Sequence, residues 1–130
     1  MIERFKQIVN DKSERDLELF IIELFNDSEN SKIYYSVIEK VLLCKWHNLQ
    51  EDLINLIYLK NLKYDGFVRP IFEIATNEEE YRFLDDELEP TLRKCVHALK
   101  MIDSTKSNLA IEELMKTGNE NIKIVLEMYR

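Results

Sequence analysis

At 130 residues and 15.6 kDa, the chain can bury one hydrophobic core without disulfides or metals, so we expect a single domain over 1–130. Asp and Glu outnumber Lys and Arg by 25 to 18, and the net charge of −7 argues against direct binding to nucleic acid, which needs clustered basic residues. Charged residues interrupt every hydrophobic stretch, so we expect no leader, no membrane-spanning segment and a cytoplasmic location.

Helices account for the whole pattern of the chain. Only two Gly and two Pro punctuate it, and no stretch of four to eight residues alternates apolar with polar between turn signals. The sequence therefore predicts an all-α protein.

Two helices are expected at the start of the chain. The first spans residues 2–9, and Ser13 can cap the second. The polar residues 26–30 predict a loop after it. The core-facing residues of the second helix, at spacings of three and four, are Leu17, Phe20, Ile21 and Leu24.

A third helix, from about 32 to 46, and a fourth, from about 49 to 62, should meet at a corner around residues 46–48. Asn48 can accept from backbone N–H groups of the next turn while Glu51 reaches back, which predicts a capping box. The apolar residues on the two sides of the corner are Val37, Ile38, Val41, Leu42, Leu49, Leu53, Leu56 and Ile57.

The turn at 64–66 leads into a fifth helix over 67–75, with Pro70 in its first turn. Asn77 and Glu80 can cap a short helix. Pro90 is expected to start a strong helix with a clear apolar face. That face consists of Leu92, Cys95, Val96, Leu99 and Ile102.

The end of the chain predicts two more helices. Thr105 or Asp103 would cap the first, and Gly118 would end it in a left-handed conformation. Asn119 would cap the last helix. Together the helices form hairpins over about 14–46, 48–75 and 91–117, with the final helix covering the open end, a spacing typical of HEAT-type repeats.

Two stretches carry a family resemblance. Residues 94–102, KCVHALKMI, followed by 110–114, AIEEL, resemble a HEAT repeat. Residues 46–53, WHNLQEDL, are similar to a Trp-His-x-x-His-Glu-Asp stretch of small bacterial HEAT-like proteins, with Gln50 in place of the second His. Several of those proteins are immunity proteins of polymorphic or contact-dependent growth inhibition toxin systems. The resemblance, over about 41–126, implies a HEAT-like α-solenoid that binds a cognate toxin domain.

The charge is concentrated in residues 73–89, which we call the acidic segment. It holds eight acids and one base, Arg82, and leaves 17 acids and 17 bases elsewhere. It is either a solubilising loop or a surface that attracts a basic partner and speeds their encounter. Tyr64 and Tyr81, beside acids in the connections, could anchor an interface. The acids are Glu73, Glu78, Glu79, Glu80, Asp85, Asp86, Glu87 and Glu89.

Other aromatic residues are expected to pack within the fold, because they lie amid apolar positions of their helices. They are Trp46, Tyr34, Tyr35 and Tyr58.

A metal site has weaker support. Cys44-x-x-His47 and Cys95-x-His97 could supply four zinc ligands, but on one helix Cys95 and His97 would point about 160° apart. We favour two reduced core thiols, two partly exposed histidines and no metal.

An enzyme is not expected either. The chain has no Gly-rich phosphate loop, no nucleophile elbow and no His-Glu-x-x-His motif, so no cofactor is expected. Its carboxylate pairs, at 51–52 and 85–86, are adjacent and do not share a helix face. We expect an immunity protein that binds a basic nuclease toxin domain. The alternatives are a generic helical-repeat scaffold and, more weakly, a hydrolase or nucleic-acid repair protein on the same fold.

Overall fold

The computed structural model describes residues 2–26, 35–44, 46, 49–76 and 85–129. Regular structure in these ranges is entirely helical, which confirms the all-α prediction. None of the described helices combines the length and apolar character that crossing a membrane requires. The elements are α1 (Ile2–Asp11), α2 (Glu14–Asn26), α3 (Tyr35–Leu43), α4 (Gln50–Leu59), the 3-10 turn η2 (Asp65–Phe67), α5 (Val68–Thr76), α6 (Asp85–Ile102), α7 (Thr105–Met115) and α8 (Glu120–Glu127).

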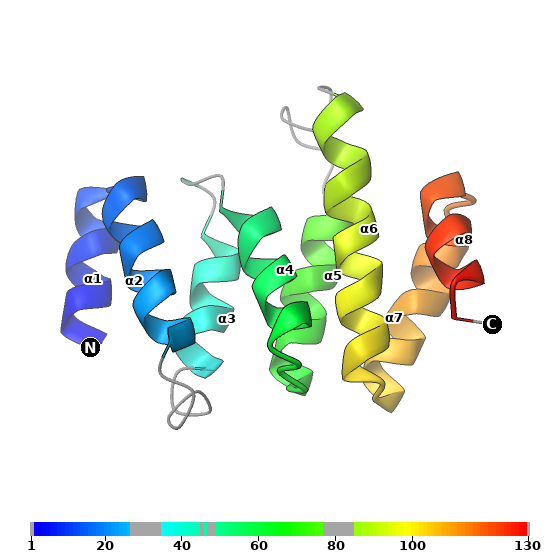
Figure 1. Ribbon diagram of the computed structural model, residues 1–130, viewed down its shortest axis with the longest axis horizontal. Coiled ribbons are helices and arrows are strands. Elements are labelled where there is room, and N and C mark those ends of the chain that lie inside the picture. Colours follow the sequence, from blue (N-terminus) through cyan, green and yellow to red (C-terminus); the bar gives the residue numbers. More distant parts are fainter. Residues whose placement is uncertain (1, 27–34, 45, 47–48, 77–84, 130) are drawn as a thin grey trace.

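The helices stand side by side along the long axis of the molecule, with the two ends of the chain at opposite ends of the row (Figure 1). In that view α2, α4, α6 and α8 lie in front of α1, α3, α5 and α7. The long helix α6 packs against α4 and α8 in its own layer and against α5 and α7 in the other. It therefore forms the centre of the C-terminal part of the fold.

The core lies between the two layers, as the helical spacing predicted. All four expected core residues of α2 are buried, and so are all five of α6. Around the corner at 46–48 every expected core residue is buried except Leu56, which is half-buried. Trp46, Tyr35 and Tyr58 pack against the core, as predicted, whereas Tyr34 lies outside the described residues.

Several helix ends follow the predicted chemistry. The backbone N–H of Asp16 donates to the Ser13 hydroxyl at 3.2 Å, which caps α2. Pro70 is the third residue of α5, in its first turn, and Gly118 adopts a φ of 72° after α7. The end of α4 was not predicted: Asn61 has a φ of 57°, and the backbone N–H of Leu62 donates to the carbonyl of Ile57 at 3.1 Å.

The corner differs from its prediction. α3 ends at Leu43, and the side-chain amide of Gln50 donates to the carbonyl of Cys44 at 2.8 Å. The N-cap of α4 is Leu49, without a side-chain cap, and Asn48 lies outside the described residues. The carboxylate of Glu51 accepts from Lys94 at 2.8 Å. The predicted capping box also needs Asn48, so it lies outside the described residues.

Two further helix starts were misplaced. α6 begins at Asp85 and runs through Pro90, because acidic residues in a first turn complement the helix dipole and favour an earlier start. The N-cap of α7 is Ser104, which forms a reciprocal capping box with Ser107, while Asp103 has a φ of 48°. The short helix predicted at Asn77–Glu80, the loop beyond Asn26 and the start of the third helix lie outside the described residues.

Candidate partner-binding surface

The acidic segment is divided between two helices. Glu73 lies in α5 and pairs with Arg69 of the preceding turn, with 3.2 Å between Nε and Oε1. Glu78, Glu79, Glu80 and Tyr81 lie outside the described residues. The remaining acids occupy the first turns of α6, so they belong to a helix start and not to a connection. These α6 acids are Asp85, Asp86, Glu87 and Glu89.

Tyr64 sits where the chain enters η2. Its ring lies 4.9 Å from those of Tyr35 and Phe67, centroid to centroid. It also covers Gly66 so closely that a Cβ at that position would lie 2.3 Å from the ring. Tyr64 is therefore half-buried and holds the turn together, and its role as an interface anchor stays a prediction.

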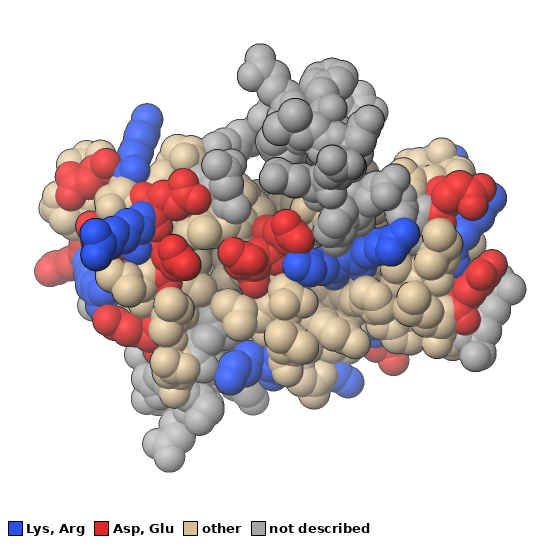
Figure 2. Space-filling model, turned by 45° about the horizontal axis from the view of Figure 1, so that its top comes forward, with Lys and Arg blue, Asp and Glu red and all other residues tan. Residues whose placement is uncertain are grey.

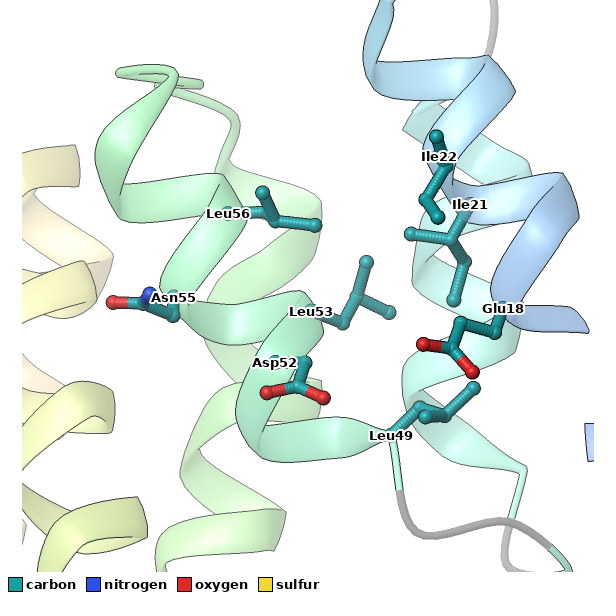
Figure 3. A pocket seen from close by; sticks show the side chains of 8 residues that line it. All are labelled: Glu18, Ile21, Ile22, Leu49, Asp52, Leu53, Asn55 and Leu56. Atoms are coloured by element: carbon teal, nitrogen blue, oxygen red, sulfur yellow. The ribbon is translucent and has the colours of Figure 1, made fainter. Parts of the chain in front are cut away.

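An open groove of about 280 Å³ lies between α2 and α4. α2 approaches α4 less closely than α4 approaches α6, so the side chains leave a gap between these two helices. Ile21, Leu49 and Leu53 form a buried floor, and Ile22 and Leu56 stand on the two sides, as Figure 3 shows. The floor of the groove is apolar.

Two carboxylates flank this groove. Glu18 of α2 and Asp52 of α4 are exposed and line it from opposite sides, whereas Asn55 points away from α2 in Figure 3. Among the described residues neither carboxylate forms a hydrogen bond or an ion pair. The groove therefore combines an apolar floor with two carboxylates that no other described residue neutralises.

Basic side chains lie next to the acidic side chains of α2 and α4. Figure 2 shows acidic side chains over α2 and α4 and a row of basic side chains beside them over α6. Lys94 of α6 pairs with Glu51 of α4 at 2.8 Å, and both side chains are about one-third exposed. The ion pair joins α4 to α6, and the close packing of these two helices supports this side of the groove.

A second cluster joins α4, α6 and the residues after α8. The hydroxyl of Tyr129 lies 2.6 Å from Nδ1 of His97, and the ring of Tyr58 lies 5.4 Å from that of His97. Burial lowers the pKa of His97. Burial, and then the neighbouring Tyr58, raises the pKa of Tyr129 to about 12. Both groups are therefore neutral at pH 7, and their bond ties the C-terminal residues to α6.

The cysteines are free thiols in different surroundings. Cys95 is fully buried, whereas Cys44 is half-buried and its Sγ donates to the carbonyl of Lys40 at 3.2 Å. Burial raises the pKa of the Cys44 thiol. Within the described ranges no three His, Cys, Asp or Glu residues gather in a way that could hold a metal ion, and His47 lies outside those ranges.

Comparison of the chain with protein-family models, with curated proteins and with solved structures found no match. An apolar floor beside two carboxylates that have no partner among the described residues suits binding.

Sequence reasoning missed both the groove and the His97 cluster. The sequence held one sign of the groove: α2 has two large apolar residues, Leu19 and Ile22, that do not belong to its core-facing side. The cluster left no such signal, since its members come from three elements that only the fold brings together.

Proposed function

We propose that the chain is a HEAT-like stack of helical hairpins that acts by binding and not by catalysis. Its partner would be a cognate basic toxin domain with nuclease activity, which it neutralises in the cytoplasm as an immunity protein. The observation that carries this proposal is the concentration of the whole net charge in residues 73–89.

The α6 acids strengthen this charge argument. Four of the eight acids of the segment fall within the first five residues of one helix. A cluster of carboxylates of this density produces a negative potential that attracts a positive surface over roughly a Debye length, about 8 Å at physiological salt. Such attraction raises the rate of encounter more than the final affinity, which suits an inhibitor that must reach a nuclease before it cuts.

The row of helices supports a binding role in a second way. Antiparallel helices in two layers give a long, rigid face, and repeat proteins commonly use such faces to hold a partner. Blocking could occur over the nuclease cleft or beside it.

The proposal is tested with the protein encoded by the neighbouring gene, if that gene encodes a long secreted protein with a basic C-terminal domain. Coexpression of that domain with this chain should give a complex on size exclusion and should protect cells and DNA from the nuclease. The chain with all α6 acids changed to amides should bind more slowly. A neighbouring domain that forms no complex and stays toxic in the presence of this chain would overturn the proposal.

A helical-repeat scaffold is the second candidate, because exposed apolar residues occur at both ends of the row. Leu19 and Ile22 lie exposed on α2, and Ile124, Met128 and Tyr129 lie exposed on or after α8. A scaffold would hold two different proteins at once, so a ternary complex on size exclusion would favour it over an immunity protein.

A further inference from the structure

We propose that the groove between α2 and α4 receives a segment of a protein partner in which a large apolar side chain lies next to Lys or Arg. The apolar side chain would fill the groove over Leu53, and the basic group would contact Glu18 and Asp52. The inference draws on the proposed function only for the basic character of the partner.

The volume of the groove selects this kind of occupant. Small-molecule sites usually enclose roughly 300–1,000 Å³ and cover most of the ligand. This groove, about 280 Å³, is at the lower end of that range and is open to solvent along the gap between the helices. It therefore fits one or two protruding side chains better than a cofactor.

The lining of the groove selects an apolar side chain at the bottom. The floor residues Ile21 and Leu53 are 5% and 1% exposed, whereas Ile22 at the edge is 48% exposed. An apolar group placed here would remove the exposed part of Ile22 and the half-exposed Leu56 from water, which is favourable in proportion to the area covered.

The two carboxylates select a basic neighbour. Their unpaired charge would repel phosphate groups, so a nucleic acid or an anionic membrane surface fits poorly. A Lys or Arg next to the apolar side chain in the partner would contact Glu18 of α2 and Asp52 of α4. Arg would do so best, because its planar guanidinium carries five donors.

A binding mode with one apolar anchor and a charged rim is common at protein interfaces, where a few buried groups supply most of the affinity. The groove lies on the side of α4 that faces α2, and the start of α6 lies beyond α4, so a partner could contact both places. A partner held at both places would be fixed in one orientation.

The probe for this proposal is a short amphipathic leucine–lysine peptide, titrated into the isotope-labelled chain and followed by amide chemical shifts. The largest shifts should fall in α2 and α4. The same peptide with glutamate for lysine, or with serine for leucine, should bind at least tenfold more weakly.

Two matched pairs of variants locate the site. Ile22→Ala should raise the Kd about tenfold, the change expected when roughly two methylene contacts are lost, whereas Leu19→Ala, on the same helix and 49% exposed, should not. The double variant Glu18→Gln/Asp52→Asn should flatten the salt dependence of binding. Glu112→Gln/Glu120→Gln, which changes two exposed acids elsewhere, should not.

Three outcomes would overturn the proposal. They are equal effects of Ile22→Ala and Leu19→Ala, chemical shifts confined to α6 or α8, and self-association of the chain that Ile22→Ala abolishes, which would make a second copy the occupant. If a toxin domain binds equally well to the groove variants, this inference is wrong and the proposed function stands. If the chain binds the peptide in the groove but binds no toxin domain, the proposed function is wrong and this inference stands.

Discussion

Tyr129→Phe should destabilise the fold by a small, defined amount. The change removes the hydroxyl that lies 2.6 Å from Nδ1 of His97 and keeps the ring, whose centroid is 5.6 Å from that of His97. A neutral hydrogen bond contributes about 0.5–1.5 kcal/mol to stability. Because Tyr129 is 43% exposed, we expect the lower part of that range, about 0.5–1 kcal/mol.

The same cluster predicts how stability depends on pH. Burial lowers the pKa of His97, so the unfolded chain binds a proton at this histidine more readily than the folded chain. The free energy of unfolding should therefore be at its full value above about pH 6.5 and fall as the pH drops below it. The pKa of Tyr129 is raised to about 12, so the folded chain keeps this proton longer than the unfolded chain, whose pKa is about 10. Stability should therefore also fall as the pH rises from about 10 to 12.

Urea unfolding followed by circular dichroism tests both statements. Tyr64→Phe is the control, because the ring of Tyr64 also packs against aromatic rings, those of Tyr35 and Phe67. His97→Gln should remove the loss of stability on the acid side. If Tyr129→Phe is no less stable than Tyr64→Phe, or if His97→Gln loses as much stability in acid as the unchanged chain, the bond described here does not form in solution.

Three further changes test other parts of the structure. Leu53→Ala removes most of a fully buried side chain and should cost about 2–5 kcal/mol in the free energy of unfolding, measured with urea; a cost below that of an exposed leucine such as Leu19→Ala would contradict the packing of the corner. Ser104→Ala should lower the free energy of unfolding by about 1 kcal/mol, because it removes the N-cap of α7, and Thr105→Ala should lower it less. A larger effect of Thr105→Ala would mean that Thr105 is the cap, as the sequence predicted. Changing the α6 acids to amides should slow association with a basic partner and weaken the dependence of the association rate on salt, both measured by stopped flow. If Glu112→Gln/Glu120→Gln slows association equally, the acidic segment only aids solubility.

Helical periodicity was enough to find the elements and their buried faces. Residues such as Leu17, Phe20 and Leu99 repeat at three and four positions, and the fold buries each of them. That signal is strong because one face of a helix must leave water whatever its neighbours are.

The helix ends were less predictable, because several chemically reasonable caps lay close together. Asp103, Ser104 and Thr105 can all accept from the next turn, and the choice of Ser104 follows from the left-handed conformation of Asp103. The start of α6 was misplaced because Pro90 is a familiar first residue, whereas the acids before it are also favourable in a first turn.

The groove could not be predicted from sequence for a different reason. It depends on the distance between α2 and α4, and periodicity says which faces are apolar without saying how closely two faces approach. Glu18 and Asp52 are 34 positions apart and look like ordinary surface residues until the fold places them across one gap.

The loose approach of α2 to α4 also divides the molecule into parts of unequal local stability. α1 and α2 pack against each other and share the Arg4–Glu23 ion pair, whereas α6 is surrounded by α4, α5, α7 and α8. Backbone amides of the first two helices should therefore exchange with solvent through partial opening, at a lower free energy than those of α6. A ligand that spans α2 and α4 would suppress this opening, so protection would appear in α1, a helix that does not line the groove.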